Sequence, residues 1–200
     1  MIHDSIRSNE TIELPSGDTS SIARSTFRQC HVLGKTAASN LTVIDSVFEQ
    51  CEVRWKGPLK NKSWLSVLFS GCVFRGEYIG NRFGHETRVT RSGAMLGGMV
   101  DCDLTDCSLD GTSFLNCDIT KIKFPAWPSF TLIAPVSHAE ELMRLSESMP
   151  QALQTTIRVS ATAHPETSAV TWSAAKLVKD SGLDEATILD IVKTLPQTLF

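Results

Sequence analysis

The six cysteines of this 200-residue chain offer its widest range of chemistry, because thiolates bind metal ions, form disulfides and act as nucleophiles. They lie at positions 30, 51, 72, 102, 107 and 117. Their spacing contains no Cys-x-x-Cys pair and does not arrange the four ligands of a structural zinc ion. Each cysteine stands three residues after one apolar residue and two before the next, as in Phe48-x-x-Cys51-x-Val53. We therefore expect reduced thiols that pack in a core, and no metal site.

The five histidines give no pattern of a catalytic centre. They are scattered at positions 3, 31, 85, 138 and 164, and none has a Ser, Cys or carboxylate partner at a spacing typical of catalytic pairs. The sequence also lacks Gly-x-Ser-x-Gly, His-Glu-x-x-His and a glycine-rich phosphate loop. We therefore expect a protein that is not an enzyme and that requires no cofactor.

A group of basic side chains is the first candidate for binding a partner. Arg82, His85, Arg88 and Arg91 crowd a segment in which the apolar spacing of the rest of the chain breaks down. Binding residues are often concentrated in irregular segments of this kind. The alternative interpretation is a charged loop that is simply solvated.

An acidic cluster is the second candidate. Asp101 and Asp106 are five residues apart, and we expect them at equivalent outer corners of neighbouring repeats. Asp103, Asp110 and Asp118 extend the cluster. The plainer explanation is that the outward positions of a repeat must be polar to stay soluble. An interaction face is the alternative.

A five-residue apolar period predicts the elements that position these side chains. From Met99 to Ile119 a large apolar residue recurs every fifth position, and from Cys102 to Cys117 the position two before it is Cys or Thr. Neither a helix nor a flat strand has this period, whereas a solenoid of short repeats does. Cysteines 30, 51 and 72 are spaced by 21 residues, so we expect one inserted residue in each of the links 34–40 and 56–62.

The same period predicts the core and one interruption. The expected core residues are Phe27, Cys30, Phe48, Cys51, Phe69, Cys72, Cys102, Leu104, Cys107, Leu109, Phe114, Cys117 and Ile119. Stepping by five from Trp64 assigns Ile79 and Gly84 to the large inward positions, and Glu77 and Arg82 to the small ones. Because these residue types do not suit those positions, we expect 77–87 to be bulged or looped out.

Four consecutive units carry a family resemblance: Cys102-Asp103-Leu104-Thr105-Asp106, Cys107-Ser108-Leu109-Asp110-Gly111, Thr112-Ser113-Phe114-Leu115-Asn116 and Cys117-Asp118-Ile119-Thr120-Lys121. Over residues 22–124 the chain resembles the pentapeptide-repeat family, whose unit is a small residue, a polar one, a central Leu or Phe and two polar ones. The resemblance implies a right-handed quadrilateral parallel β-helix, here of about five coils of about 20 residues each. The expected fold class is this β-solenoid followed by a small all-α domain.

The expected domain organisation follows from where the repeat stops. It comprises an N-terminal segment (1–21), the pentapeptide-repeat β-helix (22–124), a connector and end cap (125–136) and an α-helical domain (137–200). Pro125 and Pro128 cannot donate to a strand ladder, so the solenoid should end there. We expect Trp127 and Phe130 to cover its last coil.

Helix signals occur throughout the remainder of the chain. Ser137 and Glu140 are spaced as a capping box, Pro150 can begin a second helix, Gly182 can end a third and Asp184 can cap a fourth. Residues 176–195 imitate a helix-turn-helix, but the second helix is acidic and so unsuited to phosphate contacts. We expect this domain to pack on the rod or to make a homodimer.

Charge decides between the roles that the resemblance implies. Some pentapeptide-repeat proteins mimic duplex DNA and bind DNA gyrase, but residues 1–125 here hold 14 acidic and 14 basic side chains. We therefore favour a non-catalytic protein-binding scaffold, specifically a bacterial immunity protein that neutralises a partner toxin by direct binding. The alternatives are a gyrase-binding (topoisomerase-protection) protein and a dimerising structural scaffold. A polar start and the lack of a long apolar run predict a cytoplasmic protein that contacts neither membranes nor nucleic acid.

Overall fold

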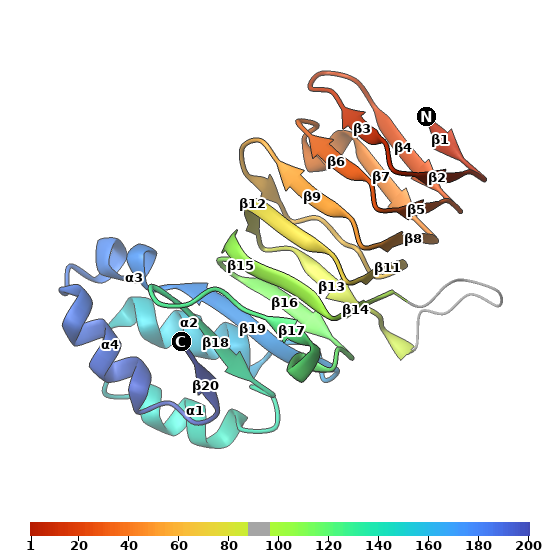
Figure 1. Cartoon of the computed structure of the whole chain (residues 1–200). Helices are drawn as coiled ribbons and strands as arrows, with labels where there is room; N and C mark the ends of the chain where they lie inside the picture. Colours follow the sequence, from red (N-terminus) through yellow and green to blue (C-terminus); the bar gives the residue numbers. More distant parts are fainter. Residues whose placement is uncertain (88–96) are drawn as a thin grey trace.

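Short strands and tight corners wind the first part of the chain into a parallel β-solenoid of about five coils (Figure 1). The computed structural model describes residues 1–87 and 97–200. Four α-helices within this part of the chain gather at the end of the solenoid opposite the N-terminus. Among the described residues, no helix combines the length and the apolar character needed to cross a bilayer.

Three parallel sheets form faces of the solenoid in the described residues. The first contains β1 (Ile2–His3), β4 (Ser20–Ala23) and β7 (Leu41–Ile44). The second contains β2 (Ile6–Ser8), β5 (Thr26–Arg28), β8 (Ser46–Glu49), β11 (Val67–Ser70) and β14 (Gly98–Val100). The third contains β3 (Thr11–Leu14), β6 (His31–Gly34), β9 (Glu52–Trp55), β12 (Val73–Ile79), β15 (Cys102–Ser108) and β17 (Ile122–Lys123), with β10 (Leu59–Lys60) beside β12. The ladder thus begins at Ile2, upstream of the boundary expected at residue 22.

Residues with left-handed backbone conformation turn the chain from the second face to the third. They form one column with φ between 53° and 62°: Asn9, Gln29, Gln50, Gly71 and Asp101. Each of the first four donates its backbone N–H to a carbonyl of the next coil, at 2.7–3.0 Å. These four corners therefore turn sharply while the N–H of the corner residue stays paired.

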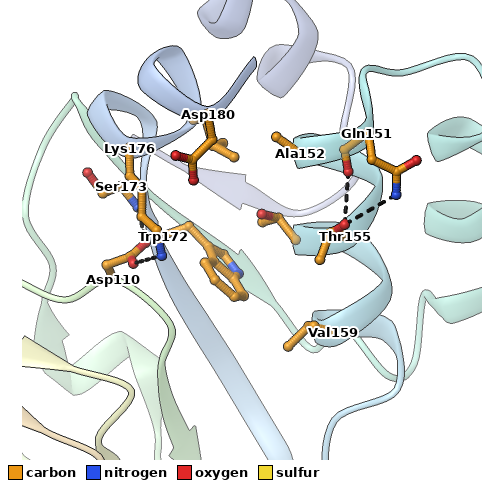
Figure 2. Close-up of a pocket in the computed structure, with 11 residues that line it drawn as sticks. Asp110, Gln151, Ala152, Thr155, Val159, Trp172, Ser173, Lys176 and Asp180 are labelled. Carbon is orange, nitrogen blue, oxygen red and sulfur yellow. Dashed lines mark hydrogen bonds and ion pairs between the residues drawn. The ribbon is translucent and has the colours of Figure 1, made fainter. Parts of the chain in front are cut away.

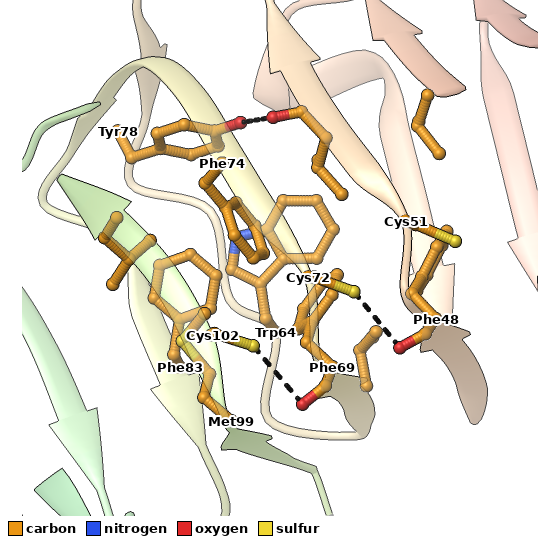
Figure 3. Packing of buried hydrophobic residues seen from close by; sticks show 14 of the residues in the cluster. Phe48, Cys51, Trp64, Phe69, Cys72, Phe74, Tyr78, Phe83, Met99 and Cys102 are labelled. Carbon is orange, nitrogen blue, oxygen red and sulfur yellow. Dashed lines mark hydrogen bonds between the residues drawn. The ribbon is translucent and has the colours of Figure 1, made fainter. Parts of the chain in front are cut away.

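Side chains stacked coil upon coil fill the interior (Figure 3). The rings of Phe27 and Phe48 lie 4.8 Å apart, and those of Phe48 and Phe69 lie 5.1 Å apart. A parallel column holds four cysteines, and the Cys72 thiol donates to the Phe48 carbonyl at 3.3 Å. Of the thirteen residues that the repeat assigns to the core, Ile119 is half-buried in a 3₁₀ turn (Ile119–Lys121) and the others are buried.

Residues 77–87 were expected to be bulged or looped out, but the chain stays in the solenoid as far as Gly84 with its register shifted by one residue. Tyr78 and Phe83 are fully buried, where the five-residue step had assigned Ile79 and Gly84. Strand β12 continues to Ile79, and β13 (Arg82–Gly84) pairs with β16 (Thr112–Leu115). The Tyr78 hydroxyl donates to the Val53 carbonyl at 2.9 Å. The tyrosine ring, which is larger than the Ile79 side chain, is therefore buried with its polar atom hydrogen-bonded.

The C-terminal unit is not all-α, because three strands run through it. Its helices are α1 (Ala139–Ser146), α2 (Gln151–Ala161), α3 (Ala174–Ser181) and α4 (Glu185–Lys193). Its strands are β18 (Ser129–Ile133), β19 (Thr167–Ser173) and β20 (Thr198–Leu199). They pair antiparallel in the order β16-β19-β18-β20, so the sheet of this unit continues directly from the last coil.

The expected end cap is also wrong. Trp127 and Phe130 pack in the second core with the helices, and the Trp127 indole donates to Glu185 at 2.5 Å. The last coil is closed by Ala169 of β19 and by Phe124, whose ring meets that of Phe114 edge-on at 5.1 Å. A strand edge is covered best by another strand, which pairs its backbone groups as well as covering its apolar side.

Helix ends in this unit follow the sequence signals in three of four cases. Gly182 ends α3 with φ of 72°, and the Asp184 carboxylate accepts the Thr187 N–H at 2.9 Å to cap α4. Helix α2 begins directly after Pro150. The capping box expected at Ser137 does not form, because α1 begins after His138, whose side chain makes no capping hydrogen bond.

Candidate functional site

The packing of the coils leaves the outer surface as the place where this protein can recognise another molecule. Phe69, Phe74 and Phe83 meet edge-on inside the solenoid, with ring centroids 5.0–6.1 Å apart. In the described part of the chain, every buried side-chain nitrogen and oxygen has a hydrogen-bond partner. The described interior is therefore occupied by packed apolar side chains, and its buried polar side-chain atoms are paired.

The thiols are part of this filled interior. Burial raises the pKa of Cys107 to about 12 and that of Cys117 to about 11, which keeps both protonated at neutral pH. Their thiols therefore lack the thiolate character that nucleophiles and metal ligands need. Within residues 1–87 and 97–200, no group of three or more His, Cys, Asp or Glu side chains could hold a metal ion.

The two described members of the basic group lie at the edge of the last coils, and both interact with other residues of this protein. Arg82 on β13 forms an ion pair with Glu86. The His85 ring places Nδ1 3.0 Å from the Gly97 carbonyl, and its own carbonyl accepts the Asn116 amide at 3.1 Å. Arg88 and Arg91 lie outside the described residues.

Asp101 and Asp106 occupy different kinds of position, so the expectation of equivalent corners is wrong. Asp101 is a left-handed corner residue whose carboxylate lies 3.9 Å from the Lys121 ammonium. Asp106 lies within strand β15, opposite Arg75 of β12, and forms an ion pair with it. The third face takes an irregular register between these strands, which moves Asp106 off the corner.

Polar contacts and ion pairs connect neighbouring strands on the third face. His31 lies 3.1 Å from Glu52, Glu52 lies 3.2 Å from Arg75, and Arg75 pairs with Asp106. On strands β15 and β17 of the same face, the Lys123 ammonium lies 3.3 Å from Asp103, whose pKa is lowered mainly by hydrogen bonds from Thr105. Exposed pairs of this kind stabilise weakly, but they neutralise the face and fix the directions of its charged groups.

Of the two remaining acidic residues of that cluster, Asp118 accepts the Thr120 N–H at 3.1 Å, and Asp110 anchors the two parts of the molecule to each other. Within the described residues, Asp110 is the one acidic side chain that is buried. It accepts the Ser173 backbone N–H at 3.2 Å and the Lys176 ammonium at 2.9 Å. The hydrogen bond to Asp110 is the main cause of the raised pKa of Lys176. No sequence signal predicts this pair, because the two residues do not belong to a common motif.

A cleft of about 400 Å³ opens beside this anchor, between α2 and α3 (Figure 2). The Trp172 ring, Leu177, Ala152 and Val159 provide its apolar surface. Its polar rim comprises Asp110, Gln151, Thr155, Thr156, Ser173, Lys176 and Asp180. An apolar floor with a polar rim is typical of binding sites, and the cleft was not foreseen because its walls come from separate helices.

No protein-family model matches the sequence, and no curated protein matches it either. The candidate surfaces of this protein are therefore defined by their geometry: the charged third face, the edge that carries Arg82 and His85, and the cleft beside Asp110.

Proposed function

We propose that this protein is a non-catalytic protein-binding scaffold built on a right-handed quadrilateral β-helix of the pentapeptide-repeat type. The observation that carries the proposal is the filled interior, which leaves the outer faces and the C-terminal unit for recognition. Coil steps of 21 residues, such as Phe27 to Phe48 to Phe69, support the quadrilateral form, since four five-residue sides and one insertion make that length.

A rigid rod suits the binding of a folded protein. Its strands pair in register from coil to coil, so its side chains are held at fixed spacings along each face. Little conformational entropy is lost when such a surface binds, which favours tight and specific complexes.

The partner that we propose is a bacterial toxin, which the scaffold neutralises by direct binding in the cytoplasm. This step is taken from the way that repeat scaffolds are used, and it is an analogy from fold. The appended C-terminal unit, with its open cleft, supplies a second recognition surface beside the rod.

The alternative of a DNA mimic that binds gyrase is weakened by the pairing of surface charges. Duplex DNA carries one negative charge per about 1.7 Å of its axis. Here Asp101, Asp103 and Asp106 each lie beside a basic side chain. A surface whose acidic groups are paired with basic ones does not reproduce that field.

The test is affinity capture from the source organism, with the captured protein identified by mass spectrometry and then purified. A stoichiometric toxin whose activity is abolished by this protein in solution would establish the immunity role.

Two double variants locate the interface: Arg88→Ala with Arg91→Ala, and Asp101→Asn with Asp106→Asn. Gyrase subunits, captured in a salt-sensitive manner and lost with the second pair, would replace our proposal with DNA mimicry. Self-association without any other stoichiometric protein would favour a dimerising scaffold instead.

A further inference from the structure

The cleft between α2 and α3 contains a carboxylate that makes no direct hydrogen bond or ion pair with the described residues. Among the described residues, Asp180 has neither an ion-pair partner nor a hydrogen-bond donor for its side chain. Figure 2 shows it on α3 at the same opening as Trp172, across the cleft from the helix that carries Thr155, with its carboxylate oxygens on the side of Lys176. A free carboxylate beside apolar surface is a point where a cation from another molecule can bind.

The aromatic floor of the cleft limits what that cation can be. The Trp172 indole N–H is already donated to the Ser160 hydroxyl at 2.9 Å, so the half-buried ring offers its π surface rather than a hydrogen bond. Beside it, Val159 is 52% exposed although it is apolar, and Ala152 and Leu177 continue the same surface. A side chain with an apolar stem and a planar cationic end would suit this cleft. The stem would cover the aliphatic surface, and the cation would stack on the Trp172 ring.

The basic residue at the rim does not prevent a second cation from binding. The Lys176 ammonium forms its ion pair with Asp110 at 2.9 Å, and Asp180 on the next turn of α3 adds only a weaker electrostatic attraction that also raises the pKa of Lys176. Counting Asp110, Lys176 and Asp180 together, the cleft has a formal charge of −1. Charge complementarity therefore favours a positively charged occupant.

We infer that this cleft binds an arginine side chain of a partner protein, with the guanidinium against Trp172 and paired to Asp180. Arginine combines a planar fork that fits a carboxylate, a face that stacks on aromatic rings and an apolar stem. The volume of about 400 Å³ is at the small end of the range for ligand sites, which suits a side chain rather than a whole helix. The inference rests on the proposed function, because it assumes that the natural occupant belongs to a protein.

The experiment uses small probes and the full chain, and it needs no knowledge of the partner. The indole N–H resonance of Trp172 is assigned with Trp172→Phe and followed by NMR as N-acetylarginine amide is added. N-acetyllysine amide and N-acetylnorleucine amide are the matched cationic and apolar probes. We expect a saturable shift with the arginine probe and binding that is at least about tenfold weaker with the other two.

Asp180→Asn should weaken the arginine probe about tenfold, because a charge-assisted pair becomes a neutral contact. Asp190→Asn is the control, since it makes the same change on α4, where the carboxylate is 78% exposed and pairs with Lys193. Equal shifts with norleucine amide would overturn the inference in favour of an apolar anchor. Equal shifts with lysine amide, or none with arginine amide, would also overturn it.

Affinity capture with the Asp180→Asn chain separates this inference from the proposed function. A partner that is retained by the variant, together with a silent arginine probe, refutes the inference and leaves the scaffold function standing. An arginine probe that binds through Asp180, in a protein that captures no partner, supports the site and refutes the scaffold function.

Discussion

The Asp110 carboxylate and the Lys176 ammonium meet at 2.9 Å although 66 residues separate them in the sequence. Asp110 belongs to a corner after β15, and Lys176 lies in the first turn of α3. The same carboxylate holds the backbone N–H of Ser173, where β19 passes into α3. One buried side chain thus fixes the direction in which the helical part leaves the solenoid.

We expect Asp110→Ala to lower the free energy of unfolding by about 2–3 kcal/mol, because it leaves the Ser173 N–H without its partner. Lys176→Ala should cost a similar amount, since it leaves the Asp110 carboxylate, whose side chain is only 10% exposed, without its cation. Urea denaturation measures both. Hydrogen exchange at Ser173 should accelerate in the Asp110 variant alone. Equal exchange in the two variants would show that the carboxylate does not hold this turn.

The stacked phenylalanines should dominate the stability of the rod. Phe48 lies between Phe27 and Phe69 at 4.8 Å and 5.1 Å, so Phe48→Ala removes two ring contacts and leaves a cavity. We expect a loss of about 3–5 kcal/mol in urea denaturation. Ile6→Ala is the control, because that side chain is 75% exposed on the same sheet, and it should change stability by less than about 0.5 kcal/mol. Similar losses in both variants would contradict the stacked core.

Gly84 is required by the close approach of two coils. Its φ is +102°, and a β-carbon there would lie 1.8 Å from the Leu115 carbonyl oxygen, far inside contact distance. Gly57 has φ of +87° but no atom within 4 Å of a β-carbon. Gly57→Ala should therefore cost only the strain of left-handed backbone, about 1 kcal/mol. Gly84→Ala should cost more or prevent folding, which thermal unfolding of the two variants compares directly. A smaller cost at Gly84 than at Gly57 would refute the predicted clash.

Two buried thiols predict a fall in stability at high pH. Unfolded cysteines ionise near the ordinary thiol pKa of 9.0, whereas folded Cys117 keeps its proton to about pH 11 and Cys107 to about pH 12. Between these values the unfolded chain releases protons that the folded chain retains, so the free energy of unfolding falls as pH rises above 9. Each thiol contributes a slope of at most about 1.4 kcal/mol per pH unit.

The measurement is urea denaturation from pH 8 to pH 10.5. A Cys107→Ala/Cys117→Ala double variant should lose stability less steeply over this range, whatever constant cost the two substitutions carry. The raised pKa of Tyr78 is due mainly to burial, which the variant keeps, and only in smaller part to Cys107. Parallel curves would show that these thiols are not buried in the folded state.

The interior of the solenoid could be predicted from local spacing alone. A five-residue period repeats the same small and large inward positions in every coil, so Cys102, Cys107 and Cys117 could be assigned inward from their immediate neighbours. The helix ends at Gly182 and Asp184 could also be predicted from neighbouring residues, because a helix cap depends on residues within one turn.

The register near Tyr78 depended on the tertiary structure. The period favoured Ile79, but burying the Tyr78 ring next to Phe74, with its hydroxyl on the Val53 carbonyl, removes more apolar area from water. That carbonyl belongs to the preceding coil, 25 residues away, so the local pattern could not specify the shift.

Strand β19 and the cleft depended on the fold even more. Residues 167–173 become a strand because the open edge of β16 and strand β18 pair with them on either side. The cleft then forms where α2 and α3 flank this strand, which brings Asp180 to the same opening as Trp172. The sequence by itself determined the repeat, the inward residues and the local helix ends. Only the tertiary structure decided which distant backbone edges and charges meet, because those contacts are selected by the whole fold and leave no local periodicity.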